Sequence, residues 1–136
     1  MGAINYFTSD YITMGLRPYD RSDFANIETE LNKHNFQYYH ITIKPGYYEG
    51  FTLDIENNFP VAFDGWEDRK EANKEITKIK GFLIACAGLG LVQCSPGWCT
   101  GYNDYKGTIV AIKAAIKEMR EEVKTIPTWA QYERAV

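Results

Sequence analysis

The run "HITIKPGYYEGFTLDIE", residues 40–56, limits the fold most, because its apolar and polar side chains alternate with a period of two. A slip of one residue between its two halves would place an apolar side chain opposite each acidic one. Pairing Ile43 with Leu53 and Ile41 with Ile55 avoids this and keeps one face apolar. We therefore expect an antiparallel hairpin whose apolar face packs on the core and whose strands are joined by a five-residue loop, Gly46 to Gly50.

The other face of this hairpin carries the first candidate site. The same register pairs His40 with Glu56, Thr42 with Asp54 and Lys44 with Thr52. A histidine beside a carboxylate can act as a general base, so His40, Asp54 and Glu56 are candidate catalytic residues of a hydrolase. The alternative is a solvated sheet face with cross-strand charge pairs, which we favour because the chain has no recognisable nucleophile or P-loop motif.

Three segments have helical periodicity. The segment 20–35 has apolar side chains at helical spacing, with Ser22 as the predicted N-cap and Asn35 as the predicted stop. A second helix is predicted from Asp64 as N-cap, with Glu67 three residues later. Its apolar stripe comprises Ala72, Ile76, Ile79, Leu83 and Cys86. A third helix carries its own apolar side, and Pro127 ends it. That side comprises Ile109, Ile112, Ile116, Met119 and Val123.

These elements give an order that suggests a fold. With a strand within 5–16 and another over 91–94, the order is β-α-β-β-α-β-α. We therefore predict a single α+β domain over residues 1–136, with two layers in ferredoxin-like β-α-β-β-α-β order and an added C-terminal helix.

The glycine-rich segment "SPGWCTGYNDYKG", residues 95–107, is the second candidate site, because unpaired N–H groups at a helix start bind anions. A nucleotide or phosphate module would use the hydroxyls, glycines and lysine of this loop: Ser95, Gly97, Thr100, Gly101 and Lys106. The segment lacks the Walker lysine and the dinucleotide glycine spacing. The alternative is a structural loop, with Asn103 or Asp104 capping the helix.

The third candidate site is the hairpin tip. Tyr47, Tyr48 and Glu49 lie between glycines, and aromatic side chains beside a carboxylate are typical anchors of protein interfaces. Tyr38 and Tyr39 crowd the same hairpin. The alternative is that these rings lie flat over neighbouring apolar surface.

Charge and composition limit the partners. A net charge of −3 and 18 acidic against 15 basic residues lack the basic footprint of nucleic-acid binders. No secretory signal or membrane-length apolar run is evident, so we expect a cytoplasmic protein with no membrane association. Cys86, Cys94 and Cys99 are expected to be reduced thiols, and we expect no metal or cofactor.

The segments "SDYITMG", "KPGYYEGF", "PGWCTGY" and "PTW" resemble parts of small uncharacterised proteins encoded by phages and mobile elements. The resemblance covers less than a quarter of the chain and implies a cytoplasmic accessory protein that blocks a host defence system. It carries over no catalytic residue. Combined with the displayed tyrosines, it favours a non-enzymatic factor that binds a host protein over either the nucleotide module or the hydrolase.

Overall fold

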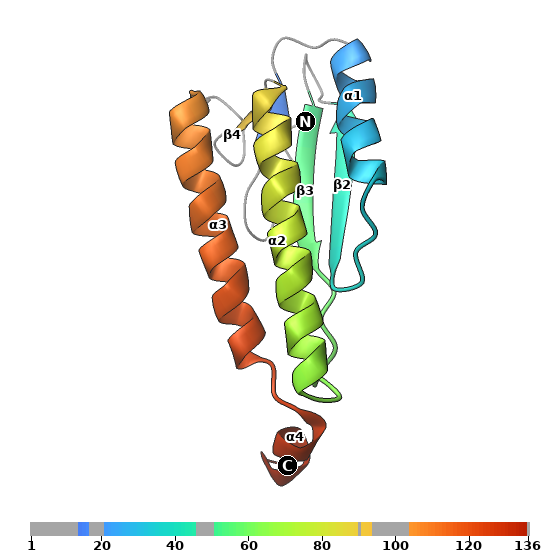
Figure 1. The fold of residues 1–136 in the computed structure, drawn as a ribbon, viewed down its shortest axis with the longest axis vertical. Coiled ribbons are helices and arrows are strands. Elements are labelled where there is room, and N and C mark those ends of the chain that lie inside the picture. Colours follow the sequence, from blue (N-terminus) through green and yellow to red (C-terminus); the bar gives the residue numbers. More distant parts are fainter. Residues whose placement is uncertain (1–13, 17–20, 46–50, 90, 94–103, 136) are drawn as a thin grey trace.

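The computed structural model describes residues 14–16, 21–45, 51–89, 91–93 and 104–135. Strands and helices alternate along the chain in the order predicted from the sequence, followed by one further short helix (Figure 1). The elements are β1 (Met14–Leu16), α1 (Arg21–Asn32), β2 (Tyr39–Pro45), β3 (Phe51–Asn57), α2 (Trp66–Gly88), β4 (Leu91–Gln93), α3 (Tyr105–Thr125) and α4 (Trp129–Ala135).

The β2–β3 hairpin confirms the predicted register. Ile43 pairs with Leu53, Ile41 with Ile55, and His40 with Glu56, all antiparallel. Ile41 and Ile55 are buried and Ile43 is partly buried against the core, whereas Glu56 is exposed. The side chains of Leu53 and Asp54 lie outside what the structure describes. The period-two pattern therefore predicted the pairing correctly, and Ile41, Ile43, Ile55 and Glu56 lie on the predicted faces.

The predicted ferredoxin-like two-layer class is wrong, because helices and not sheet dominate the described structure. The four described strands pair in the order β2-β3-β1-β4, but β1 and β4 contribute only three residues each. The helices α2 and α3, with 23 and 21 residues, run antiparallel and pack more extensively on each other than on any strand (Figure 1). At about 34 Å, α2 is longer than the strands of about 23 Å, so part of the core lies between α2 and α3 beyond the ends of the strands.

Helix α2 buries the predicted stripe but begins differently from the prediction. Its buried side chains include the whole stripe from Ala72 to Cys86. The N-cap is Gly65, which has no side-chain cap, so the prediction of Asp64 was wrong. Instead the backbone N–H of Asp64 donates to the Asp68 carboxylate at 2.8 Å. Asp68 is the third helical residue, and a carboxylate there reaches back to the incoming chain as in a capping box.

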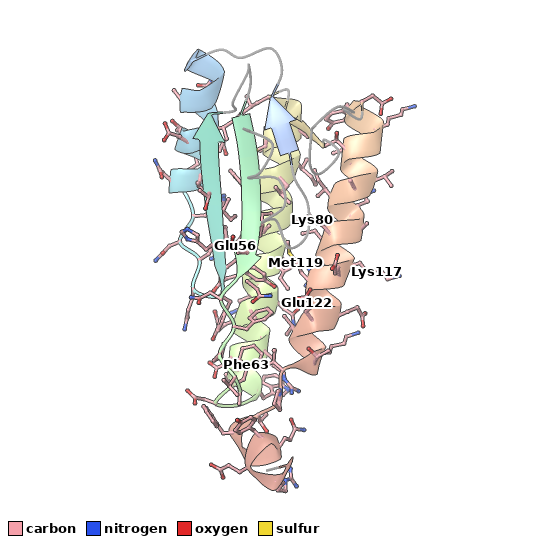
Figure 2. The ribbon with its side chains drawn as sticks, turned by 180° about the vertical axis from the view of Figure 1, so that it is seen from behind. Glu56, Phe63, Lys80, Lys117, Met119 and Glu122 are labelled. Atoms are coloured by element: carbon pink, nitrogen blue, oxygen red, sulfur yellow. The ribbon has the colours of Figure 1, made fainter. Side chains whose placement is uncertain are left out.

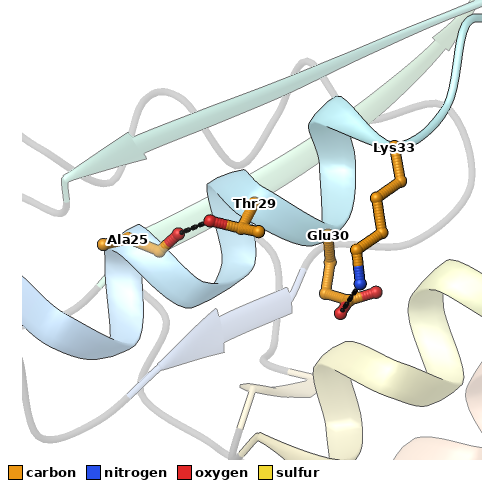
Figure 3. Close-up of polar contacts among 4 residues, drawn as sticks. All are labelled: Ala25, Thr29, Glu30 and Lys33. Atoms are coloured by element: carbon orange, nitrogen blue, oxygen red, sulfur yellow. Dashed lines mark hydrogen bonds and ion pairs between the residues drawn. The ribbon is translucent and has the colours of Figure 1, made fainter.

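Of the other predicted helix ends, those of α1 were wrong and the N-cap of α3 was among the predicted alternatives. Helix α1 already includes Ser22 and ends at Asn32, so Ser22 is not its N-cap and the helix ends three residues before Asn35, the predicted stop. Its exposed side carries local bonds, from the Thr29 hydroxyl to the Ala25 carbonyl and from the Lys33 ammonium to the Glu30 carboxylate (Figure 3). Helix α3 is capped by Asp104, whose carboxylate accepts from the Gly107 N–H at 2.7 Å, one of the two predicted alternatives.

Helix α4 was not predicted. Pro127 ends α3 as expected, but the chain then forms a reciprocal cap. The Thr128 N–H donates to the Gln131 side chain at 2.9 Å, and the Gln131 N–H donates to the Thr128 hydroxyl at 3.3 Å. This is the capping box T-x-x-Q, readable in "PTWAQ".

One buried carboxylate joins the helices to the hairpin. Glu75 of α2 is buried and accepts the backbone N–H groups of Gln37 and Tyr38, each at 2.9 Å. These two residues immediately precede β2. Because both donors would otherwise lack a partner near the core, Glu75 fixes where the first hairpin strand starts relative to α2.

Candidate functional site

The predicted catalytic face is not assembled into a site in the described residues. His40 and Glu56 are exposed and opposite each other, and Asp54 pairs with Thr42 through the backbone. Across the described ranges, no group of three or more histidine, cysteine or acidic residues is placed to hold a metal ion. This arrangement is that of an ordinary solvated sheet face.

The predicted partner-binding residues Tyr47, Tyr48 and Glu49 lie outside the described residues, so their role stays a prediction. Tyr38 and Tyr39, which crowd the same hairpin, are 5% and 3% exposed and belong to the core. The Tyr38 ring meets Phe63 edge to face, with 5.6 Å between centroids. Their place follows from the buried start of β2, where Glu75 holds the backbone.

Most of the predicted anion loop also lies outside the described residues, including Ser95, Gly97, Thr100 and Gly101. Lys106 is exposed in the first turn of α3. The start of that helix is already capped by Asp104. Where the structure describes this helix start, it therefore shows the structural alternative of a self-capped helix.

Of the three cysteines, Cys86 is described and is fully buried in α2. Burial, followed by the negative charge of Glu30, raises the pKa of its thiol to about 12. A thiol with so high a pKa carries almost no thiolate at neutral pH and is a poor nucleophile. Cys86 is therefore a structural residue.

The described residues contain a groove at the end of the molecule where α4 lies, below the N-terminus of α2 (Figure 1). It is open and has a volume of about 410 Å³. We call it the aromatic groove, and its lining residues are Gln37, Tyr38, Asn58, Phe59, Pro60, Ala62, Phe63, Asp64, Asp68 and Trp129. Phe63, one of these residues, lies between the strand ends and α4 (Figure 2).

Backbone bonds hold the two sides of this groove together. Phe63 and Thr128 form a parallel bridge, in which the Phe63 N–H donates to the Pro127 carbonyl at 2.8 Å. The Trp129 N–H donates to the Phe63 carbonyl at 3.0 Å. The Arg69 guanidinium donates to the Ile126 carbonyl at 2.6 Å. Segments that lie far apart in sequence are thus fixed beside each other.

The charge of the aromatic groove has one sign. Asp64 and Asp68 are the charged residues in its lining, and no basic side chain lines it. The Tyr38 hydroxyl donates to Asp68 at 3.4 Å. Burial, followed by the charge of Asp68, raises the pKa of Tyr38, which therefore remains a neutral donor. Carboxylates beside aromatic rings form an environment suited to a cation.

One exposed apolar side chain, Trp129, lines the groove, and Val61 and Trp66 are exposed next to lining residues in the sequence. Val61 and Trp66 are 61% and 68% exposed, and Trp129 is 42% exposed. The Trp129 ring packs edge to face on Tyr132, which is also exposed. A cation already sits at this end, since the Lys70 ammonium lies 5.4 Å from the Trp66 ring centroid. An apolar rim of this kind around a groove is typical of an interaction surface.

Sequence reasoning missed this groove, although one signal for it was present. The T-x-x-Q box at 128–131 predicts a helix start, and hence a fixed position for Trp129. Nothing in the sequence shows that residues 58–64 and 127–129 meet, because their contact is a backbone bridge without a side-chain pattern.

Comparison with protein-family models, with curated proteins and with solved structures gives no match. None of the described helices combines the length and the apolar character needed to cross a membrane. The proposal below therefore rests on the side chains of this chain.

Proposed function

We propose that this chain is a small protein-binding factor that works in the cytoplasm by covering a surface of a host protein. The observation that carries the proposal is the aromatic groove, where exposed apolar side chains surround a lining whose charged residues are both carboxylates. Tryptophan and tyrosine at a groove are the residue types that dominate protein-interface energetics. The groove is fixed by backbone bonds, so little order would need to be gained on binding.

The groove favours a partner segment that presents a lysine or arginine beside an apolar side chain. The cation would lie between Asp64, Asp68 and the ring of Trp129, and the apolar neighbour would pack on the rim. Opposite charges across the interface would speed association and orient the partner. Inhibition of a host defence protein, which the resemblance to phage and mobile-element proteins implies, would be one case of such occlusion.

The test uses the full chain as bait in host cytoplasmic extract and compares variants. Trp129→Ala removes the exposed anchor, and Asp64→Asn removes one charge without removing a described hydrogen bond of that side chain. Tyr105→Ala is the matched control, because this tyrosine is 52% exposed at the opposite end of α3. We expect the captured protein to be lost from both groove variants and kept by the control.

Affinity then makes the test quantitative. Removing an anchoring aromatic should cost about 2 kcal/mol, roughly thirtyfold in Kd. Loss of the Asp64 charge should weaken binding most at low salt. Binding that is equal in Trp129→Ala, Asp64→Asn and the wild type would refute this groove as the interface, and would direct attention to Tyr47 and Tyr48.

A further inference from the structure

A second groove, whose lining is basic where that of the aromatic groove is acidic, lies between α2 and α3. It is open, has a volume of about 510 Å³, and we call it the basic groove. Its lining residues are Asn73, Lys113, Ile116, Lys117, Arg120, Glu121 and Lys124. Ile116 forms its buried floor, while Lys117 points away from the strands and Met119 points in among the helices and strands (Figure 2).

The cations of this groove follow one edge of α3. Lys113, Lys117, Arg120 and Lys124 are spaced four, three and four residues apart, so neighbouring cations face each other along the helix. Like charges at this spacing destabilise a helix by a few tenths of a kcal/mol per pair. A chain with a net charge of −3 places them together despite that cost.

Few acids offset these charges. Glu121 is the one acidic residue in the lining, and it pairs with Lys124 at 3.2 Å. The other ion pairs in the described part of the chain join Lys33 to Glu30 and Lys74 to Glu71, and none of these four residues lines the groove. Lys113, Lys117 and Arg120 therefore have no ion-pair partner among the described residues.

Arg120 is held in position across the groove. Its guanidinium donates to the Thr77 hydroxyl at 3.0 Å and to the Asn73 side-chain oxygen at 3.4 Å, both on α2. A guanidinium has five N–H donors, so these bonds leave others for a ligand. Because its orientation is fixed by neutral partners, the guanidinium keeps its full charge for an incoming anion.

We propose that the basic groove binds a linear run of phosphate groups. The cations extend over twelve residues of α3, about 16 Å from the first to the last, which is enough for several successive phosphates. Lysine supplies point charges and arginine a fork that matches phosphate oxygens. No aromatic side chain lines the groove, so it offers no surface for stacking a base and recognises the phosphates alone. This site is independent of the aromatic groove and adds to the proposed function.

The test uses the full chain and fluorescently labelled linear inorganic polyphosphate, with Kd measured over a range of NaCl concentrations. Unlabelled oligothymidylate of matched phosphate number competes in one arm, and polyglutamate of matched charge in another. The variants are Lys113→Gln, Lys117→Gln and Arg120→Lys. Lys33→Gln is the matched control, since it removes the same charge from an exposed lysine directly after α1, and α1 lies on the opposite side of α2 from α3 (Figure 1).

We expect both phosphate chains to bind and polyglutamate to compete weakly. The slope of log K against log salt for oligothymidylate should fall by about 0.7 for each lysine removed. Arg120→Lys should weaken binding although it keeps the charge, because the fork is lost. Tighter binding of oligothymidylate than of polyphosphate identifies a nucleic-acid backbone as the source, and the reverse identifies polyphosphate.

Three results would overturn the proposal. These are no binding of either phosphate chain at low salt, equal binding of polyglutamate and polyphosphate, and variants that bind as tightly as Lys33→Gln. Melting temperatures of all variants confirm that the fold is intact, and exposed lysines of this kind are not expected to alter it.

Discussion

The aromatic groove and the basic groove are built in different ways. Backbone bridges and a buried carboxylate hold the first, through Phe63, Thr128 and Glu75. Side chains on the surfaces of two regular helices form the second, and only Arg120 is tied in place across them. The shape of the aromatic groove should therefore depend on the stability of the fold, whereas binding in the basic groove should change when its surface cations are replaced and the fold stays intact. Mutations can separate these two kinds of dependence.

The largest expected effect is that of Glu75→Ala. It leaves the buried N–H group of Tyr38 and the partly buried N–H group of Gln37 without their acceptor, and should lower the free energy of unfolding by about 3 kcal/mol. Chemical denaturation measures this. Glu75→Gln keeps one acceptor and should lose less. In this variant, partner binding at the aromatic groove should weaken at temperatures where phosphate binding at the basic groove persists. Equal loss of binding at both grooves would contradict the comparison.

High pH tests the core at the C-terminal end of α2, the end opposite the aromatic groove. The Cys86 thiol has a pKa of about 12 in the folded chain, against an ordinary value of 9.0. Above pH 9 the unfolded chain releases this proton and the folded chain keeps it, so stability present below pH 9 is lost as pH rises towards 12. The free energy of unfolding should fall with pH by up to about 1.4 kcal/mol per pH unit.

Denaturation curves of Cys86→Ala supply the control for this pH dependence. The variant should be less stable at neutral pH but should show a shallower decline above pH 9. Tyr38→Phe should also flatten the curve, because the raised pKa of Tyr38 acts in the same direction. A decline as steep as in the wild type in both variants would show that other groups cause it.

Thr128→Ala should cost about 1 kcal/mol, the usual effect of removing an N-cap. The Gln131 N–H loses its acceptor, so α4 should fray and Trp129 should move from the groove. Tryptophan fluorescence and binding of the captured partner measure the two effects. Thr125→Ala is a control threonine near the end of α3, whose hydroxyl bonds within its own helix. Partner affinity unchanged in Thr128→Ala would contradict a role for α4.

The smallest expected effect is on the stability of the Lys117→Gln variant. Removing one of several neighbouring cations should change the free energy of unfolding by less than about 0.5 kcal/mol, and should raise it if the charges repel. The same variant should lose phosphate affinity. A loss of stability larger than that of Lys33→Gln would mean that Lys117 supports the fold, which would remove the contrast between the grooves.

The sequence predicted those parts of the fold in which apolar residues recur with the period of a strand or a helix and lie on a buried face. The alternation in 40–56 fixed the hairpin register, and the stripe from Ala72 to Cys86 fixed the buried side of α2. The predicted fold class was wrong, because the order of the elements does not show how much longer α2 is than the strands. The relative length of helices and strands decides which of them forms the core.

The candidate sites were harder to predict than the fold. A burial pattern cannot show that Tyr38 is held inward by Glu75, since the two residues lie 37 positions apart. The bridge of Phe63 to Thr128 has no side-chain signature either. The basic residues of α3 can be read from the sequence. That Arg120 lies opposite Asn73 and Thr77 depends on how α2 and α3 pack, which the sequence does not show.

The bridge between Phe63 and Thr128 also has a consequence for motion. The amide protons of Phe63 and Trp129 are each donated across it, so either both are protected from exchange with solvent or neither is. If α4 detaches as one cooperative unit, these two protons should exchange at the same rate, ahead of those in the middle of α2. A single slow opening event would then set how often the aromatic groove is lost in the free chain, and a bound partner should slow that event.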